Sequence, residues 1–224
     1  GDMKACHDFV KTIKKDYDYI KIISGNIVTT EAARRYYDAG IDGFRVGIGI
    51  GSGYITRTVC GVGYNQLLAI KEIKERFPDI PIISDGGIRN SGDIVKVLAS
   101  GADTVLVGGL LAVAQESPAE RINKIAYINN SFSGSTRNEI KSFVRYYGMA
   151  SKYAEEKRIK RTGEDATDII HLQAPEGKEV YLEDSGESVK AIINRLIQGM
   201  KMGMAYLGAK DIQELRKKAK WTEI

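Results

Sequence analysis

The chain has 224 residues, of which 43% are hydrophobic and 28% charged, and its formal net charge is +4. This composition is typical of a globular protein with one sizeable core, and no apolar run is long enough to span a bilayer. Basic residues are spread along the expected helices beside acidic ones, which favours a hydrated surface over a nucleic-acid-binding stripe. The start of the chain does not resemble a signal peptide, and Cys6 and Cys60 show neither metal-binding nor disulfide spacing. A reducing, cytoplasmic setting is therefore expected.

The first half of the chain alternates helix and strand. Helices are predicted over residues 8–15, 29–39, 64–77 and 91–100, and strands over 19–24, 43–48, 80–84 and 104–107. Caps are expected at Thr29 or Thr30 and at Asn90 or Ser91. Short buried strands between helices indicate parallel βαβ units, so the strands are expected to be parallel neighbours in chain order. A barrel and a doubly wound sheet both give this alternation, and a closed parallel barrel needs eight strands.

The second half of the chain is less regular. A helix is predicted to begin at Ser117-Pro118, followed by a polar loop over residues 129–137. Residues 152–180 are charged, irregular and poor in apolar anchors, which is typical of a mobile flap. Amphipathic helices are predicted over residues 189–205 and 211–219, where they would close the end of the domain.

Glycine-rich segments follow three of the predicted strands. They are Gly47–Gly53, Ser84–Gly87 and Val107–Leu110. Glycine lets the backbone approach a ligand and present N–H groups to an anion, and parallel α/β folds place their sites at the carboxyl ends of strands. Each segment alone is also compatible with a simple turn or a helix cap. Two such glycine pairs on neighbouring strands favour a phosphate-bearing ligand.

A series of motifs resembles the IMP dehydrogenase/GMP reductase family in order and approximate spacing. The motifs are GNIVT (residues 25–29), VGIGIGS (46–52), GVGYNQ (61–66), ISDGG (83–87), VGGLLA (107–112), YGMAS (147–151), APEG (174–177) and GMKMGMAYLGAKDIQEL (199–215). The resemblance covers nearly the whole chain. It implies an α/β fold, the (β/α)8 TIM barrel.

The resemblance implies only the second half of that barrel. Gly1 matches the glycine just after the family's fourth strand, so residues 1–224 correspond to strands five to eight plus the flap (152–180) and the C-terminal helices, in one barrel domain whose N-terminal half is absent. A half barrel leaves sheet edges and apolar surface open. We expect a fragment of a longer chain. The alternatives are a separate chain that supplies the other half and self-assembly.

The resemblance also assigns roles to individual residues. The phosphate of a purine nucleotide is expected at Ser52, Gly87, Gly108 and Gly109, with help from Tyr146; the ribose hydroxyls at Asp85; and the base at Met149, Ala150 and Glu176. Asn26, Gly47 and Gly49 are expected beside the base and the nicotinamide of NADPH or NAD, and a K+ ion is implied at Gly49 and Gly51. Thr56 and Glu176 match the residues proposed to handle protons in GMP reductases.

One position departs from the family pattern. The family places its nucleophilic cysteine two residues after the serine that matches Ser52, and this chain has Tyr54 there. A phenol with a pKa near ~10 attacks a purine poorly compared with a thiolate. Cys60 is interpreted as an ordinary loop residue, with replacement nucleophile as the alternative. His171 is interpreted as a surface residue of the flap, with a general base as the alternative.

Three functions remain open at this stage. Tyrosine in GVGYNQ, serine in ISDGG and the second glycine in VGGLLA favour a GMP reductase-like enzyme that converts GMP to IMP with NADPH. The alternatives are an IMP dehydrogenase, which converts IMP to XMP with NAD, and a non-catalytic purine-nucleotide binder. The family resemblance further implies a cytoplasmic homotetramer that acts on neither membranes nor nucleic acids.

Overall fold

The computed structural model describes residues 2–129, 136–163 and 174–222. Its internal contacts divide the chain into two compact units. Unit 1 consists of Gly1–Gly51, Thr56–Val107 and Arg195–Ile224, and unit 2 consists of Ser52–Ile55 and Gly108–Asn194. Each unit is described separately below.

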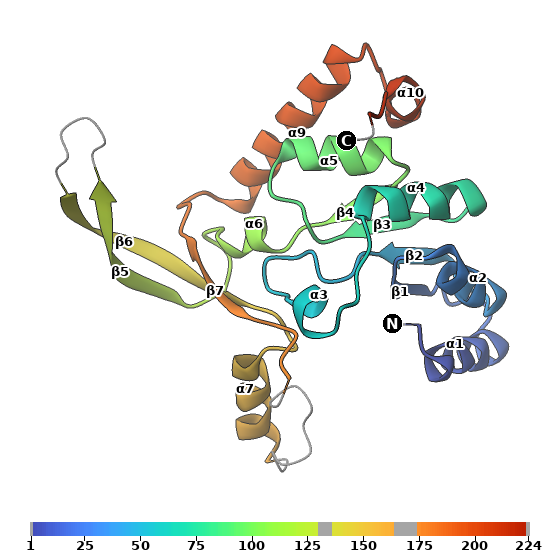
Figure 1. Cartoon of the computed structure of the whole chain (residues 1–224), viewed down its shortest axis with the longest axis horizontal. Helices are drawn as coiled ribbons and strands as arrows, with labels where there is room; N and C mark the ends of the chain where they lie inside the picture. The colour runs from blue at the N-terminus through green and yellow to red at the C-terminus, as the bar shows by residue number, and fades with distance from the viewer. Residues whose placement is uncertain (1, 130–135, 164–173, 223–224) are drawn as a thin grey trace. The chain divides into compact units, whose positions relative to one another are not determined.

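Unit 1 is built on a parallel sheet of four strands, shown in Figure 1. The strands are β1 (Ile23–Ile27), β2 (Gly43–Val46), β3 (Ile82–Asp85) and β4 (Thr104–Leu106), and they lie in chain order. All three strand pairs are parallel, as the alternating pattern predicts. The sheet does not close into a barrel within the described residues, so the structure contains a part of the predicted barrel.

The helices of unit 1 form one layer that follows the strand order. These helices are α1 (Lys4–Asp16), α2 (Thr30–Asp38), α4 (Gln66–Arg76) and α5 (Ser91–Ala99). Each contacts the next in chain order, α4 also contacts β2 and β3, and α10 (Ile212–Lys218) packs on α5. A doubly wound sheet would divide its helices between two faces. The single layer is instead the arrangement of a barrel wall.

The core of unit 1 lies between this helix layer and the sheet. Phe44 and Val46 from β2, Ile82 from β3, and Ile70 and Ile73 from α4 are fully buried. Alternate residues of β2 and β3 are therefore buried, as expected of strands with one face against a helix layer.

The helix starts agree with the predicted caps. Thr29 accepts a hydrogen bond from the amide of Ala32 (3.3 Å), and Asn90 accepts one from the amide of Asp93 (3.0 Å). The predicted helix over 64–77 begins later, because Asn65 is its cap and accepts bonds from the amides of Leu67 and Leu68.

The first strand lies further along the chain than predicted. It was expected over residues 19–24 and to end at Gly25-Asn26, but β1 starts at Ile23 and continues through both residues to Ile27. The Ile20 amide donates to the Tyr17 carbonyl in a turn, and the Ile22 amide donates to the Asp42 carboxylate at 2.8 Å. These bonds hold the apolar residues before Ile23 outside the sheet.

Asp42 and Asp103 occupy equivalent positions before β2 and β4. Asp42 accepts from the Ile22 amide and from Lys14 (2.5 Å), and its own amide donates to the Ile22 carbonyl. Asp103 repeats this pattern with the Ile82 amide (2.8 Å) and Lys74 (3.1 Å), and its amide donates to the Ile82 carbonyl. The same set of hydrogen bonds therefore occurs in the two halves of the sheet, once between β1 and β2 and once between β3 and β4.

The lysine partners of these aspartates extend the repeat. Lys14 also donates to the Ile20 carbonyl, and Lys74 donates to the Ile80 carbonyl. Each lysine lies near the end of its helix. Its side chain donates both to a carbonyl just before the following strand and to the aspartate that precedes the strand after that.

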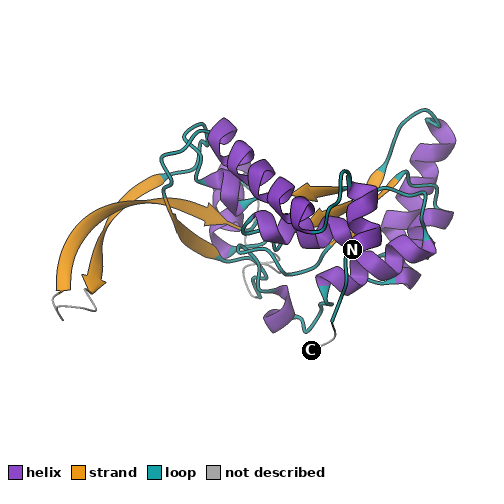
Figure 2. Ribbon diagram, turned by 90° about the horizontal axis from the view of Figure 1, so that it is seen from above, coloured by secondary structure: helices purple, strands orange, loops and turns teal. Residues whose placement is uncertain are grey.

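Unit 2 contains an antiparallel sheet in the order β5-β6-β7. Its strands are β5 (Arg121–Asn129), β6 (Thr136–Tyr147) and β7 (Glu179–Glu183), and β5 and β6 form the long twisted ribbon seen in Figure 2. The prediction of a helix start at Ser117-Pro118 and a loop over 129–137 was wrong, apart from residues 130–135, which lie outside the described part. The error arose because many ribbon residues are polar and, among those whose side chains the structure describes, Val144 alone is fully buried.

Short helices complete unit 2. Part of the predicted flap is the helix α7 (Lys152–Thr162), capped by Ser151, whose hydroxyl accepts from the Ala154 amide. The helix α6 (Gly109–Ala112) follows the second glycine pair, as predicted. Flap residues 164–173, with His171, lie outside the described part, so the mobility of the flap stays a prediction.

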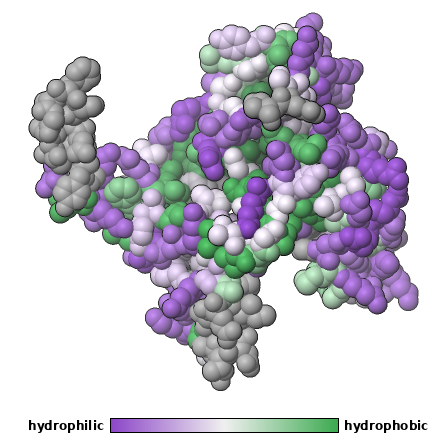
Figure 3. All heavy atoms as spheres, in the orientation of Figure 1, coloured by the Kyte–Doolittle hydropathy of each residue, from purple (hydrophilic) through white to green (hydrophobic). Residues whose placement is uncertain are grey.

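The remaining helices are α3 (Thr56–Val59) in unit 1 and α9 (Val189–Tyr206), which runs from one unit into the other. The surface of α1, α2 and α4 is largely hydrophilic in Figure 3, in keeping with exposed pairs such as Arg34–Asp38 (3.7 Å). No helix in the described ranges combines the length and the apolarity needed to cross a bilayer.

The aspartate anchors predict an acid-dependent stability. Bonds from Lys14 and the Ile22 amide lower the pKa of Asp42; burial alone would raise the pKa of Asp103, but the Ile82 amide, Arg216 and Lys74 lower it. A carboxylate with a lowered folded-state pKa stabilises the fold above its unfolded pKa, near ~3.9, and this contribution is lost as the pH falls toward the folded value. The free energy of unfolding should therefore drop below about pH 4.

Asp103→Asn should remove part of this dependence. We expect it to lower the free energy of unfolding at pH 7 by roughly 1–3 kcal/mol, the usual worth of hydrogen bonds to charged groups, and to flatten the acid limb of the stability curve. Chemical denaturation between pH 3 and 7 measures both. Asp79→Asn, in an exposed turn, is the control. An acid limb identical in Asp103→Asn and the parent would contradict the anchor role.

Candidate functional site

The ends of β1, β2 and β3 bring three polar side chains together in unit 1. Asp85, the last residue of β3, accepts hydrogen bonds from the Asn26 amide (2.6 Å) and from Arg45 Nε (2.8 Å), both at Oδ2. Asn26 also donates to the Gly47 carbonyl (2.7 Å). These groups lie close together at the carboxyl ends of the strands, although they are far apart in the sequence, and Asn26 occupies a register irregularity between β1 and β2.

This arrangement leaves two acceptor atoms available. Both hydrogen bonds to Asp85 go to Oδ2, and Oδ1 accepts none from the described residues. Asn26 uses its amide nitrogen twice, while its side-chain oxygen accepts none within the same ranges. A carboxylate oxygen suits a ribose diol, and an amide oxygen suits the carboxamide N–H of a nicotinamide. Asn26 and Asp85 therefore fit the ligand groups predicted for them.

Arg45 is a site residue that the sequence analysis missed. It lies on β2 between buried neighbours, and its own side chain is 44% exposed. Its guanidinium pairs with Asp85 at Oδ2 and so fixes the rotamer of that side chain. A charged residue at an alternate position of an otherwise buried strand was the available signal.

Gly47 is explained by packing within the sheet rather than by a ligand. Its φ is +140°, and an added Cβ would lie 2.1 Å from the Asp85 carbonyl oxygen and 3.1 Å from Gln66 Nε2. Gln66, which was also missed, donates to the Val46 carbonyl (2.8 Å) and the Ser84 hydroxyl (3.1 Å). Gln66 thus braces the strand ends that carry the polar cluster.

The glycine-rich loop after β2 lies against the turn after β3. Gly86 and Gly87 have φ of +88° and +76°, and added Cβ atoms would lie 3.0 and 3.1 Å from Ile50 side-chain atoms. The carbonyls of Gly49 and Gly51 accept no hydrogen bond from the described residues. Backbone carbonyls are the ligands that K+ takes in proteins. A different kind of metal site, built from three or more acidic, histidine or cysteine side chains, does not occur in the described part of the chain.

The predicted phosphate residues of unit 2 also lie together. An added Cβ at Gly109 would be 3.3 Å from Ser52 Oγ, and one at Gly108 would be 2.5 Å from the Tyr146 hydroxyl. Two hydroxyl groups therefore border the glycine pair that begins α6. Donors of this kind beside a glycine backbone are suited to phosphate oxygens. Gly87 belongs to unit 1 and is described with that unit.

The segment with Tyr54 is fixed to the base of the flap through backbone bonds. Tyr54 forms an antiparallel bridge with Gly177, the Ile55 amide donates to the Glu176 carbonyl (2.7 Å), and the Lys178 amide donates to the Gly53 carbonyl (2.9 Å). Added Cβ atoms at Gly177 would come within 2.5 Å of the Ser151 amide nitrogen. The backbone at the family's nucleophile position is thus held in place, with the phenol of Tyr54 38% exposed.

The other predicted residues are distributed as follows. Met149 is 73% exposed, and Ala150 follows it at half-buried depth. Thr56 begins α3, and Cys60 is exposed just beyond the end of that helix. His7 is buried against Tyr36, with ring centroids 4.4 Å apart, which favours a packing role.

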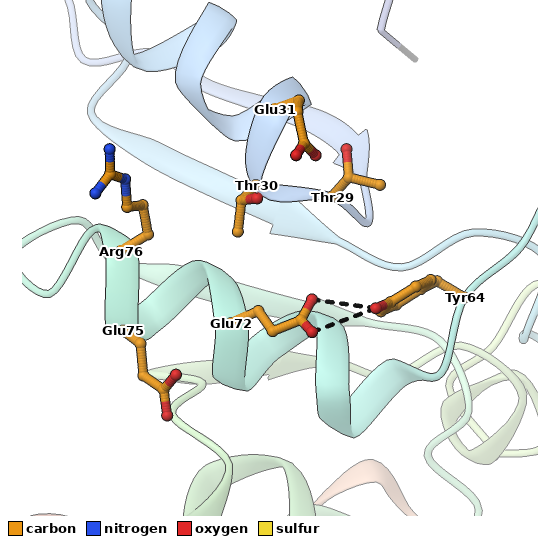
Figure 4. Close-up of a pocket in the computed structure, with 7 residues that line it drawn as sticks. All are labelled: Thr29, Thr30, Glu31, Tyr64, Glu72, Glu75 and Arg76. Atoms are coloured by element: carbon orange, nitrogen blue, oxygen red, sulfur yellow. Dashed lines mark hydrogen bonds between the residues drawn. The ribbon is translucent and has the colours of Figure 1, made fainter.

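A separate hollow of about 650 Å³ lies between α2 and α4 and is drawn in Figure 4. It is lined by Thr29, Thr30, Glu31, Tyr64, Glu72, Glu75 and Arg76, none of which was predicted as a site residue. The Tyr64 hydroxyl donates a hydrogen bond to Glu72 at 3.2 Å. The pKa of Tyr64 is raised, mainly by burial and secondly by the nearby Glu72 carboxylate. Of its acidic lining residues, Glu72 is bonded to Tyr64, and Glu31 and Glu75 are exposed.

Comparison with known proteins matches this geometry. Residues 1–224 match the model of the IMP dehydrogenase / GMP reductase domain. Inosine-5'-monophosphate dehydrogenase of Aquifex aeolicus is 38% identical over 228 residues, and GMP reductase of Leishmania major is 33% identical over 228 residues. Each alignment covers 100% of this chain and 43% of the relative, so the chain spans less than half the length of these proteins.

A solved structure agrees with the sequence comparison. The crystal structure of a cysteine-to-alanine variant of GMP reductase from Trypanosoma brucei, in complex with guanosine 5'-monophosphate, superposes with a TM-score of 0.78 at 35% identity. The match covers 97% of this chain and 42% of that one. The sheet, the glycine-rich strand ends and these matches together show that the chain belongs to the IMP dehydrogenase/GMP reductase family.

Proposed function

We propose that the full-length protein binds a purine nucleoside monophosphate at the strand ends of this domain. The observation that carries the proposal is the Asp85 carboxylate, which is held by Asn26 and Arg45 through Oδ2 and keeps Oδ1 for a ribose hydroxyl. Ser52, Gly108, Gly109 and Tyr146 support it as a phosphate-binding group within unit 2. Gly87 is proposed as a further phosphate contact, and Met149, Ala150 and Glu176 as the contacts of the base.

For the reaction, we propose a GMP reductase-like site in which Tyr54 replaces the family's nucleophile: with a thiolate at that position, GMP, NADPH and a proton would give IMP, NADP+ and ammonia. The three local motifs named above and the GMP-bound reductase structure support this assignment. The dinucleotide, when bound, would supply the hydride, and Asn26 and Gly49 are proposed to orient its nicotinamide. Thr56 and Glu176 are proposed to move protons at the purine C2 position. IMP dehydrogenation with NAD is the alternative reaction, supported by dehydrogenase relatives at 38–40% identity.

Tyr54 favours a second candidate function, a nucleotide-binding protein without turnover. The family's covalent route needs a thiolate at this position, and a phenol with a pKa near ~10 is a poor substitute. Backbone bonds to Glu176 and Lys178 hold the segment of residues 53–55, so we propose that the loss concerns the nucleophile alone. Retained ribose and phosphate contacts beside a missing nucleophile are typical of a binding or regulatory protein.

The family resemblance extends the proposal to the assembly. We propose a cytoplasmic homotetramer with a K+ ion at the Gly49 and Gly51 carbonyls and with the first half of the barrel supplied by the rest of a longer chain. The four-stranded sheet with two open edges supports the last point, because exposed parallel strands are ordinarily paired or covered.

Binding through Asp85 predicts a preference for ribonucleotides. Titration calorimetry of the full-length protein should show tighter binding of GMP than of 2'-deoxy-GMP, because the deoxy compound lacks a hydroxyl that donates to the carboxylate. Asp85→Asn should weaken GMP binding by about tenfold, the worth of one hydrogen bond to a charged group.

Asp85→Asn should also abolish the preference for GMP, whereas the exposed Asp79→Asn should change neither affinity nor preference. Absence of GMP and IMP binding to the folded full-length protein would count decisively against the proposal.

The nucleophile argument predicts the effect of Tyr54→Cys. The parent protein should oxidise NADPH with GMP only at background rate and form no covalent purine adduct. Tyr54→Cys should raise the rate, provided that Thr56, Glu176 and the nicotinamide side of the complete barrel are competent. Absorbance of the reduced cofactor measures turnover, and mass spectrometry measures adducts.

Tyr54→Ser is the matched control for this experiment, since it relieves the same steric crowding without providing a thiolate. A purine adduct on Cys60 of the parent protein would overturn the nucleophile argument. Binding without an adduct or turnover in the parent would favour the non-catalytic function.

A further inference from the structure

The loop between β2 and α4 is closed by one side chain, Arg57. Its Nε donates to the Ile48 carbonyl at 3.5 Å, and its Nη2 donates to the Tyr64 carbonyl. Ile48 lies at the start of the loop and Tyr64 at its end, so the guanidinium joins the two ends. All three residues belong to unit 1.

Glycines line the space that the Arg57 side chain occupies. A Cβ added at Gly63 would lie 2.7 Å from Arg57 Cγ and Nε, and one at Gly49 would lie 3.2 Å from Arg57 Cγ. Contacts under 3.0 Å are not compatible with a real side chain, so Gly63 is required by the arginine. The φ of Gly63 is not in the left-handed region, which means that backbone conformation alone does not demand glycine there.

Arg57 has no acidic partner among the described residues. The ion pairs within the described ranges do not include it, and its bonds go to backbone carbonyls. A guanidinium suits this task because its planar fork carries several donors with fixed directions and stays charged at every physiological pH. A lysine has a single donor group and cannot bridge the two carbonyls in the same way.

The bond to Ile48 also closes a ring around the Ser52–Tyr54 segment. Residues 49–56 lie between the carbonyl of Ile48 and the side chain of Arg57 along the chain, so the bond limits the backbone conformations available to them. This segment holds Gly49, Ser52 and Tyr54, which are the proposed nicotinamide, phosphate and nucleophile positions.

We propose that Arg57 is a positioning residue that pre-orders the loop after β2 for its nucleotide ligand. This inference rests on the proposed nucleotide-binding function. Arg57 contacts no ligand in this account; it acts through the backbone of residues 49–56. The two hydrogen bonds of Arg57 to Ile48 and Tyr64 are called the clamp. Without the clamp the loop has more conformations, so nucleotide binding includes the entropic cost of ordering the loop.

Two measurements on the full-length protein test the inference. Hydrogen exchange followed by mass spectrometry should show about tenfold faster exchange in peptides covering residues 48–64 of Arg57→Ala, with the remaining peptides unchanged. Calorimetry should show GMP binding weakened by about tenfold in Arg57→Ala and Arg57→Lys. Arg34→Ala, which removes an exposed arginine from α2, should change neither quantity.

A double-mutant comparison separates the clamp from a general loss of stability. Gly63→Ala should displace the arginine and reproduce both effects, but it should add little in the Arg57→Ala background, where the space is empty. Millimolar guanidinium should partly restore GMP affinity in Arg57→Ala and leave Arg34→Ala unchanged.

The outcomes distinguish this inference from the function on which it rests. Unchanged exchange over residues 48–64 in Arg57→Ala would overturn the clamp, whether or not GMP binds. Faster exchange with unaltered GMP affinity would overturn its role in binding. If the parent protein fails to bind GMP, the proposed function fails, and the exchange data still decide whether the clamp exists.

Discussion

The half barrel depends on a repeated ionic anchor at the bottom of the sheet. In each half, an aspartate that precedes the second strand accepts two hydrogen bonds. One comes from a backbone amide at or just before the beginning of the first strand, and the other comes from a lysine of the helix that precedes the first strand. Asp42 thereby fixes β1 to β2, and Asp103 fixes β3 to β4. Hydrogen bonds to a charged acceptor in a partly buried position define the register of short strands that have few ladder bonds of their own.

Register at the bottom determines geometry at the top, where the site lies. β1, β2 and β3 are parallel neighbours, and Asn26 lies at a register irregularity between β1 and β2; from there Asn26 and Asp85 reach each other across β2, and Arg45 on that strand completes the cluster. The loop after β2 is then shaped by Gln66, by Ile50 against the glycines of the next turn, and by Arg57. The polar cluster is therefore rigid before any ligand arrives, which reduces the cost of binding.

The parts of this arrangement that follow local rules could be predicted from the sequence. Helix caps at Thr29 and Asn90 and the parallel order of the strands are confirmed, because side-chain capping and βαβ connectivity act over a few residues or a single unit. The family assignment is confirmed as well, since its motifs are specific in order and spacing.

Other features depend on contacts that the sequence does not show. The start of β1 was misplaced because Asp42, distant along the chain, captures the Ile22 amide. The β5–β6 ribbon was missed because its sequence mixes polar and apolar residues without a regular apolar alternation. Arg45 and Arg57 were overlooked because their importance lies in carbonyl and carboxylate partners on other segments. The assigned roles of the site residues stay predictions.

A crystal structure of the full-length protein with GMP tests the central claim most directly. The account predicts a closed parallel barrel in which a ribose hydroxyl lies within hydrogen-bonding distance of Asp85 Oδ1, while Arg45 and Asn26 remain on Oδ2. It further predicts that the phosphate contacts Ser52 and the amides of Gly108 and Gly109, with Tyr54 forming no bond to the purine. A nucleotide bound elsewhere, or bound here with Asp85 turned away from the ribose, would contradict it.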